Sequence, residues 1–425
     1  MNSTVHLNNI IRSCAILLFL VSFTTPAQAQ TNSANDVCIG APALPAPQNN
    51  VVRVTNEEEL RDAIKDLRAG TTIAISPGRY NLLNTLSITV DDVTIRGESE
   101  DCSSVELIGR GMENQDYGNV GNGFWIKANN TTIANLTVRE VFLHTIQIDG
   151  NAGSPRIYNV RLVNSGQQFI KANPLDFGKG VDNGVVEYSV MEYTDGPSRV
   201  NFENVGTGYT NGVDIHAGSG WRISNNRFSN FHTPDNADHL WNAAVLAWNG
   251  ARDTITENNI FIDVDRSIAY GLEEKNNDHQ GGVIRNNMVV MTPGLYSEAR
   301  TSAADASILV WDSPGTKVLH NSLLLSGNIP NSIEVRYATR SVEVSNNIAD
   351  GSVRHRDRKF FLSNGNVTNA KPDWFINPPD GNLRIRPEAT RQLIKSRRHR
   401  EAPVDVDGNA RPLGRRVLPG ANNPE

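Results

Sequence analysis

Several short segments of the chain carry side chains that can transfer protons, together with a cation and an aromatic ring. Val213 to His216 alternates apolar and polar residues, so a strand here turns Asp214 and His216 to one face and its apolar residues to a core. A carboxylate beside an imidazole suits general acid–base chemistry. Segments with the same alternation add Lys171, a cation, and Trp248, an aromatic platform for a sugar ring.

Alternating segments recur along the chain, and a second series follows them in which asparagine holds a fixed position. The second series includes Asn226, Asn259, Asn287, Asn321 and Asn347, at intervals of 33, 28, 34 and 26 residues. Periods of this length made of strands and turns indicate a solenoid. Stacked asparagine side chains hydrogen-bond along the stack, and asparagine tolerates left-handed turn conformations. We therefore interpret the asparagine pairs as scaffold.

The composition favours an all-β protein of one repeating body. The chain has 425 residues, of which 38% are hydrophobic, and periodic amphipathic helices are nearly absent. Repeat folds grow in one dimension and so escape the usual size limit of a single core. The formal net charge of −6 does not predict a nucleic-acid partner.

Residues 1–29 read as a signal peptide. Arg12 precedes the apolar stretch from Ala15 to Phe23, and Ala27-Gln28-Ala29 is a small-x-small cleavage site. The apolar stretch is too short to span a membrane, so we expect a secreted or periplasmic protein. An oxidising compartment permits a disulfide between Cys38 and Cys102, but the sequence leaves open whether they pair or remain free thiols.

Three segments follow the signal peptide. We expect an extended arm over residues 30–50, a strand repeat over 51–350, and an irregular segment over 351–425 that packs along the solenoid. Near the start of the repeat, Asn56 is a plausible N-cap for a helix that runs through three glutamates to Leu67.

The helix before AGTTIAISPGRYNL, the strand repeats that end in NN, and the closing DVDGNARPLGRR and PGA together resemble secreted right-handed parallel β-helix proteins, the pectate lyase-like superfamily. The resemblance covers roughly Val51 to Ala421. It implies a right-handed parallel β-helix whose N-terminal helix plugs the end of the solenoid. Polysaccharide lyases of this class typically use a Lys/Arg pair with Ca²⁺, so Ca²⁺ is the candidate cofactor, with no metal ligands assigned. The fold also carries hydrolases, epimerases and adhesins.

In such a fold, equivalent outward residues of successive coils form rows on a sheet. One expected row is Gln147, Lys171, Asp214, Leu246, Leu309 and Glu334, and its neighbour is Asp149, Asn173, His216, Trp248, Trp311 and Arg336. The coil between Val185 and Tyr209 has no member in either row. The separation of Lys171 from Asp214 is therefore open by one strand spacing, roughly 4.8 Å.

The sharpest hypothesis is β-elimination on an acidic, uronate-containing polysaccharide by a monomeric enzyme. Lys171 or His216 would act as the base, Arg266 would stabilise the carboxylate or protonate the leaving group, and Asp214 would orient His216 or bind Ca²⁺. The expected substrate-binding residues are Asn173, His239, Trp241, Trp248, Asn249, Trp311 and Arg336. His239 and Trp241 lie in the insertion HTPDNADHLW.

Other functions remain open at this point. A glycoside hydrolase would need two facing carboxylates, for which Asp195, Glu203 and Asp214 are available. A C5-epimerase would use the same proton abstraction as a lyase. A non-catalytic polysaccharide-binding or surface protein would have an outward face without a charge cluster. Convergence of Lys171, Asp214, His216 and Arg266 would favour an enzyme over a binding protein.

Overall fold

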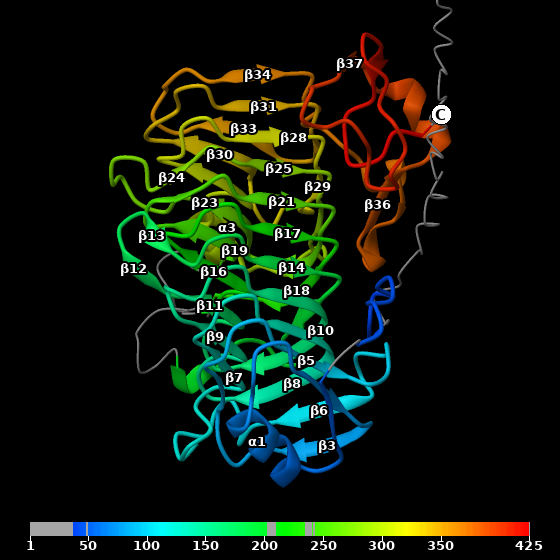
Figure 1. The fold of residues 1–425 in the computed structure, drawn as a ribbon. Helices are drawn as coiled ribbons and strands as arrows, with labels where there is room; N and C mark the ends of the chain where they lie inside the picture. Colours follow the sequence, from blue (N-terminus) through cyan, green and yellow to red (C-terminus); the bar gives the residue numbers. More distant parts are fainter. Residues whose placement is uncertain (1–36, 48–49, 202–209, 234–239, 241–242, 425) are drawn as a thin grey trace, which may run out of the picture.

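The computed structural model describes residues 37–47, 50–201, 210–233, 240 and 243–424 (Figure 1). The predicted signal peptide and two of the predicted binding residues, His239 and Trp241, lie outside these ranges. Among the described residues, no helix has the length and apolar character that crossing a membrane requires.

The chain winds into a stack of coils whose strands pair in parallel with those of the coil above and below (Figure 1). One face of the stack is a ten-stranded sheet, here called sheet B. Because successive parallel strands connect by right-handed crossovers, the fold is the right-handed parallel β-helix that the sequence predicts. In spatial order, sheet B consists of β4 (Leu86–Ile88), β7 (Phe124–Ile126), β9 (Ile146–Ile148), β11 (Ile170–Ala172), β16 (Val213–His216), β19 (Ala243–Trp248), β23 (Arg266–Tyr270), β27 (Ile308–Trp311), β30 (Asn331–Arg336) and β33 (Ser352–His355).

The other two faces form one 20-stranded sheet, because β8 (Thr132–Val141) and β10 (Arg156–Ser165) run through both of them. The first face also holds β1 (Val51–Val54), β2 (Thr72–Ile75), β5 (Thr94–Gly97), β14 (Val185–Glu187), β17 (Arg222–Ser224), β21 (Ile255–Glu257), β25 (Val283–Arg285), β28 (Lys317–Leu319), β31 (Glu343–Ser345) and β34 (Leu362–Asn364). The second holds β3 (Gly78–Asn81), β6 (Val105–Ile108), β15 (Val190–Glu192), β18 (Arg227–Phe231), β22 (Ile260–Val264), β26 (Met288–Val290), β29 (Ser322–Leu324) and β32 (Ile348–Ala349).

Alternation along each strand of sheet B sets which side chains enter the core. Ile170, Val213 and Val245 lie directly above one another in adjacent strands and are fully buried inside the solenoid. The intervening residues point outward, so every outward row is held by a column of packed aliphatic side chains. This arrangement fixes the backbone beneath the candidate site.

The two predicted outward rows occur in sheet B, with two corrections. No strand separates β11 from β16, so Lys171 and Asp214 are direct neighbours in register. A strand missing from the predicted series, β23, lies between β19 and β27 and places Ala269 between Leu246 and Leu309. Its outward residues are small, so it lacks the contrast between polar and apolar positions that identified the others.

The predicted asparagine stack lies at the corner between the two faces of the large sheet. Each side-chain amide donates to the carbonyl oxygen of the next, with N–O distances of 2.9–3.0 Å, along Asn226, Asn259, Asn287, Asn321, Asn347 and Asn366. The preceding residue of each pair takes the left-handed conformation, as at Asn225 with φ 57°. The scaffold interpretation is confirmed and the stack extends one coil further than predicted.

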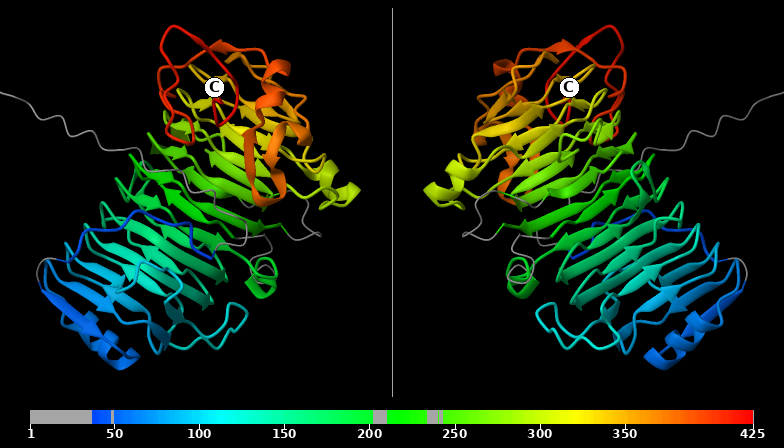
Figure 2. Two further views of the ribbon diagram at one scale, coloured as in Figure 1. Left: turned by 90° about the vertical axis from the view of Figure 1, so that its right-hand side faces the viewer. Right: turned by 90° about the vertical axis from the view of Figure 1, so that its left-hand side faces the viewer.

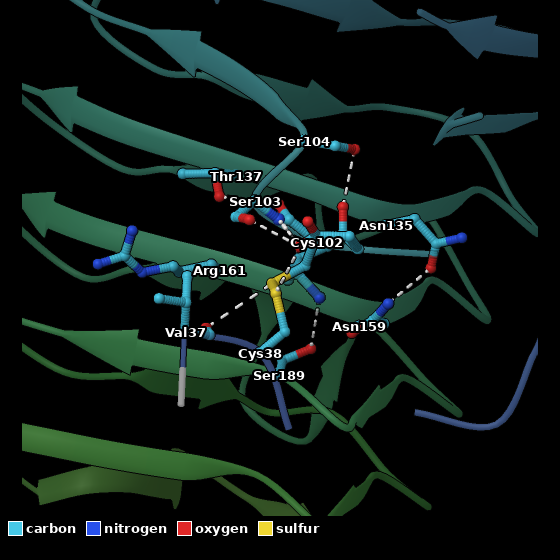
Figure 3. Close-up of a disulfide and its surroundings, with 12 residues drawn as sticks. Val37, Cys38, Cys102, Ser103, Ser104, Asn135, Thr137, Asn159, Arg161 and Ser189 are labelled. Carbon is cyan, nitrogen blue, oxygen red and sulfur yellow. Dashed lines mark hydrogen bonds between the residues drawn. A yellow bond between two sulfur atoms is a disulfide. The ribbon is translucent and has the colours of Figure 1, made fainter. Parts of the chain in front are cut away.

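The N-terminal end is closed by α1 (Glu57–Lys65), whose Asn56 cap accepts a hydrogen bond from the amide of Glu59. The leading arm runs along the body, and Cys38 forms a disulfide with Cys102 (Figure 3). Tyr158 also donates its hydroxyl to the carbonyl oxygen of Pro42 in the arm. The disulfide settles the alternative that the sequence left open.

Strands of the solenoid continue to Asn364, beyond the boundary expected at residue 350. The remaining chain lies along one side of the stack (Figure 2). It contains β35 (Phe375–Asn377), β36 (Asn382–Ile385), β37 (Ser396–Arg397), β38 (Arg416–Val417) and the 3₁₀ helices η1 (Pro372–Trp374), η2 (Pro378–Asp380) and η3 (Pro387–Gln392). Trp374 and Phe375 pack there against Met288 and Leu324 of the solenoid.

Candidate functional site

Lys171, Asp214 and His216 meet on the outer face of β11 and β16. The ammonium nitrogen of Lys171 lies 2.5 Å from Oδ2 of Asp214 and 2.7 Å from Nε2 of His216. Nε2 of His216 lies 3.3 Å from the same carboxylate oxygen. The three groups therefore form one compact triangle, which we call the Lys171 cluster.

Trp248 completes the cluster from the next strand. Its indole Nε1 donates to Oδ1 of Asp214 at 3.0 Å, and its ring centroid lies 4.5 Å from that of His216. Asp214 thus accepts one hydrogen bond on each oxygen, from an ammonium and from an indole. Its side chain is 2% exposed, whereas those of Lys171 and His216 are 9% and 14% exposed.

The electrostatics of Asp214 follow from its neighbours. Burial by itself raises the pKa of the Asp214 carboxyl group, but the charge and hydrogen bond of Lys171, together with the contact of His216, outweigh it and hold that pKa well below its ordinary value. A buried carboxylate needs a cation beside it, and the Lys171 ammonium supplies that charge. Asp214 is therefore a fixed anion rather than a proton donor at neutral pH.

The contact between Lys171 and His216 assigns a role to each nitrogen. A lysine ammonium has only donors, so Nε2 of His216 must accept in this pair and the neutral imidazole carries its proton on Nδ1. The nitrogen that faces the cluster is consequently the basic one. Of the two bases considered from the sequence, His216 is the one that holds a lone pair in this arrangement.

Two side chains next to the cluster were missed in the sequence. His144 and Gln168 are buried, and Nδ1 of His144 lies 3.1 Å from the carbonyl oxygen of Gln168. Burial first, and then the charge of Lys171, lower the pKa of His144 to about 4. His144 lies two positions before the inward Ile146, and Gln168 lies two positions before the inward Ile170. A third row of residues, aligned two positions before each inward residue, would have identified both.

Asn173 and Asn249 flank the cluster at the ends of β11 and β19 and are half-buried. The backbone amide of Asn249 donates to Oδ1 of Asp278, which fixes the turn after Trp248. The ammonium of Lys275 lies 5.2 Å from the centroid of the Trp248 ring. These residues border the predicted site without entering the triangle.

Arg266, Trp311 and Arg336 lie elsewhere. Arg266 begins β23, three strands from Lys171, and its guanidinium makes two hydrogen bonds to the carboxylate of Asp305. Among the described ion pairs, the adjacent carboxylate of Asp265 does not pair with Arg266. The structure therefore brings together three of the four predicted catalytic residues and separates Arg266 from them.

Asp265 belongs to a second buried cluster at the corner before β23. Its carboxylate accepts hydrogen bonds from the hydroxyl of Tyr296 and from the guanidinium of Arg300, which lies in α3 (Glu298–Ala303). One carboxylate oxygen also lies 2.9 Å from Nδ1 of His232. Burial raises the pKa of Asp265, but His232 and Arg300 together lower it. Every described contact of this carboxylate is with the protein itself, which is typical of a residue that stabilises the fold at this corner.

The side chains around Asp214 do not fit a Ca²⁺ ion. Ca²⁺ takes about six to eight oxygen ligands, whereas both oxygens of Asp214 are engaged by nitrogen donors and no second carboxylate joins them in the described residues. Within the described ranges, the one group of three possible ligand side chains is Cys38, Asp101 and Cys102, whose sulfurs are joined in the disulfide.

A facing carboxylate for a hydrolase is likewise missing from the described part of the site. Asp195 is exposed on its loop, Glu203 lies outside the described residues, and Asp214 is paired with Lys171. The arrangement at Asp214 is one acid with one amine and one imidazole, which suits proton abstraction next to a carboxylate better than double-carboxylate chemistry.

No family model and no curated protein matches this sequence. Several solved structures are similar in fold. An alginate lyase from Paenibacillus sp. strain FPU-7 is 15% identical, with a TM-score of 0.46 over 75% of this chain and 99% of that one. A surface adhesin of Streptococcus pneumoniae is 15% identical, with a TM-score of 0.46 over 73% and 87%. A tailspike of an Escherichia coli bacteriophage, solved with a pentasaccharide, is 15% identical, with a TM-score of 0.47 over 72% and 53%.

Proposed function

We propose that the protein cleaves a uronate-containing polysaccharide by β-elimination at the Lys171 cluster. The observation that carries this proposal is the position of one ammonium between a buried carboxylate and the basic nitrogen of an imidazole. An amine and a base side by side are what the reaction requires, because the cation steadies the uronate carboxylate while the base removes the neighbouring proton.

Lys171 would bind the carboxylate of the sugar. When a proton leaves the carbon next to that carboxylate, negative charge spreads onto its oxygens, and a fixed ammonium lowers the energy of this enediolate. Asp214 holds the ammonium in place through its 2.5 Å contact. Since the low pKa of Asp214 keeps it ionised, the carboxylate holds the ammonium in position through the cycle.

His216 would carry the proton. Nε2 takes the proton from the ring carbon, the electron pair of that C–H bond forms the new carbon–carbon double bond, and the bond to the glycosidic oxygen breaks. That oxygen leaves with its electron pair and takes the proton from the imidazolium, which restores the neutral histidine. Asp214, 3.3 Å from Nε2, stabilises the transient imidazolium.

The test is the ultraviolet absorbance of the unsaturated uronate that β-elimination leaves on the product. Purified protein is incubated with pectate, alginate and chondroitin sulfate, with Lys171→Ala and His216→Gln as variants and Ser87→Ala, on β4 of the same sheet and three strands from Lys171, as a control. We expect a rise on at least one polymer that both variants abolish and the control retains. No rise on any uronate polymer would overturn the proposal.

A second candidate is polysaccharide binding without cleavage. The observation that favours it is the low exposure of the Lys171 cluster, in which the three side chains are between 2% and 14% exposed and bond to one another. Retention of the protein on a uronate polymer with no unsaturated product would support this reading. Export through the predicted signal peptide is part of either proposal, and the Cys38–Cys102 disulfide suits an oxidising compartment.

A further inference from the structure

A second charged group lies further along the outer face of sheet B, around Trp311. The ring of Trp311 is surrounded by three guanidinium groups, whose central carbons lie 5.1 Å (Arg336), 5.5 Å (Arg356) and 5.7 Å (Arg266) from its centroid. Trp311 is 7% exposed, so the arginines cover it. We call Trp311, Arg336 and Arg356 the Trp311 cluster.

Two buried donors of this cluster have no acceptor. Among the described residues, neither Nε1 of Trp311 nor Nε of Arg336 makes a hydrogen bond. The nearest carboxylate oxygen to Nε of Arg336 belongs to Asp357 and is 3.7 Å away, beyond hydrogen-bond distance. Buried donors normally have partners, and an added anion is an acceptor of the kind that these donors lack.

The charges around Trp311 do not cancel. Arg266 pairs with Asp305, Arg354 and Arg356 share Glu334, and Arg336 lies near Asp357. Four guanidinium groups thus face three carboxylates, which leaves one positive charge in excess. Burial outweighs the neighbouring arginines and raises the pKa of Glu334. The carboxyl group of Glu334 therefore ionises less readily, which weakens its neutralisation of Arg354 and Arg356.

We propose that the Trp311 cluster binds a carboxylate of the same polysaccharide chain whose cleavage is proposed at the Lys171 cluster. Trp311 lies on the same face as Asp214, three strands away, or ~14 Å along the solenoid axis. An acidic polymer laid across the strands reaches both places with different sugar units. Arginine forks bind carboxylates with two parallel hydrogen bonds, and the guanidinium groups of Arg336 and Arg356 both lie against the Trp311 ring.

Trp311 acts in this site as a positioning residue. Its ring holds the two guanidinium groups by cation–π attraction, and its edge-on contact with Tyr337 fixes the ring. The inference rests on the proposed function because it assumes an acidic polysaccharide. It adds that affinity depends on chain length, since only an oligomer spans from one cluster to the other.

The experiment measures binding by calorimetry, which does not require turnover. The probes are hexasaccharides and disaccharides of galacturonate and of guluronate, and a neutral hexasaccharide. Arg336→Gln is compared with Arg354→Gln, which removes the same charge from the neighbouring strand at a residue that has no described contact with Trp311. We expect Arg336→Gln to weaken hexasaccharide binding about tenfold or more and to leave disaccharide binding unchanged, with Arg354→Gln within about twofold of wild type.

If Arg336→Gln and Arg354→Gln lose hexasaccharide affinity equally, the effect is one of net charge and the inference is overturned. The inference is also overturned if neither variant loses affinity. Arg336→Lys keeps the charge without the fork and should lie between wild type and Arg336→Gln. If unsaturated product forms while Arg336→Gln binds the hexasaccharide normally, this inference fails and the proposed function stands. If the arginine dependence appears without any product, the proposed function fails and the subsite stands.

The indole N–H resonance of Trp311, assigned by Trp311→Phe, gives a second readout. It should shift on addition of the acidic hexasaccharide and stay in place with the neutral one. Trp374 is the matched control, because its Nε1 is also buried without a described acceptor but belongs to the C-terminal segment, where it packs against Met288 and Leu324. A shift of both resonances, or of neither, would contradict binding at Trp311.

Discussion

The asparagine stack and the outer face of sheet B are built by the same parallel register and differ in what they repeat. At the corner, one residue type recurs and each amide makes the same bond to the next, as from Asn259 to Asn287 to Asn321. On sheet B, the equivalent positions of neighbouring strands hold Lys171, Asp214 and Leu246. One row is uniform and the other changes at every step.

This difference separates scaffold from candidate chemistry. A uniform ladder is satisfied by its own members, so it needs no ligand and any coil can be added to it. A row that brings an amine, an acid and an imidazole together once, in the middle of the solenoid, is not required by the repeat. If this difference holds, substitutions in the Lys171 cluster will reduce activity, and substitutions in the asparagine stack will reduce stability without changing activity.

The largest effect is expected from Lys171→Met. It removes the cation from the reaction and leaves Asp214 as a buried, unpaired anion. We expect turnover to fall by about a thousandfold or more and the free energy of unfolding to drop by about 3–5 kcal/mol. Urea unfolding and the product assay measure the two effects, and a variant with wild-type turnover would contradict the role given to Lys171.

Asn287→Ala should affect stability alone. Asn287 accepts from the backbone and side chain of Asn259 and donates to Asn321 and to the carbonyl oxygen of Thr256, so Asn287→Ala removes four buried hydrogen bonds and leaves the backbone amide of Asn259 without its acceptor. We expect a loss of about 3 kcal/mol with unchanged turnover per folded molecule. Lower turnover in a fully folded Asn287→Ala variant would contradict the assignment of stability to the asparagine stack and of activity to the Lys171 cluster.

Acid should weaken the scaffold before it discharges Asp214. His279 is buried between Ser313 and Thr254, and burial lowers its pKa to about 3, whereas the unfolded chain takes up the proton at the ordinary value near 6.5. Stability is therefore complete above pH 6.5 and falls as the pH drops toward 3. From this residue we expect a loss of ~2 kcal/mol between pH 7 and pH 5.

Urea unfolding at the two pH values measures that loss, and His279→Gln should flatten the difference by the same amount. An unchanged slope in the variant would mean that other groups control the acid response. The pKa of Asp214 is also lowered, so its contribution to stability persists to lower pH than that of His279 and is lost only as the pH falls below its ordinary range.

The smallest effect is expected from Trp248→Phe. The change keeps a ring against His216 but removes the hydrogen bond to Oδ1 of Asp214. We expect a loss of about 1 kcal/mol in stability and a few-fold loss in turnover. A loss as large as that of Lys171→Met would show that the indole contacts the reacting sugar directly.

The sequence predicted the fold and the outward rows because alternation and the asparagine spacing are local signals. It also identified Lys171, Asp214, His216 and Trp248 before their contacts were known. It missed β23, because the small outward residues Ser267 and Ala269 give no contrast between polar and apolar positions along the strand.

What the sequence could not supply were the long-range contacts. Lys171 and Asp214 are 43 positions apart in the sequence, which does not reveal whether a strand intervenes, and the structure shows that none does. Arg266 pairs with Asp305, 39 residues later, and not with the adjacent Asp265. Adjacency in sequence placed Asp265 and Arg266 together, whereas the backbone turns the first toward the corner and the second onto sheet B.

The most direct test of the central claim replaces the ion pair with apolar side chains. The double variant Lys171→Met/Asp214→Leu removes both buried charges, so it should recover most of the stability that Lys171→Met loses. If the cluster is the reaction centre, this folded variant will form no unsaturated uronate from a polymer that the wild-type protein cleaves. A stable double variant that cleaves that polymer at the wild-type rate would contradict the account.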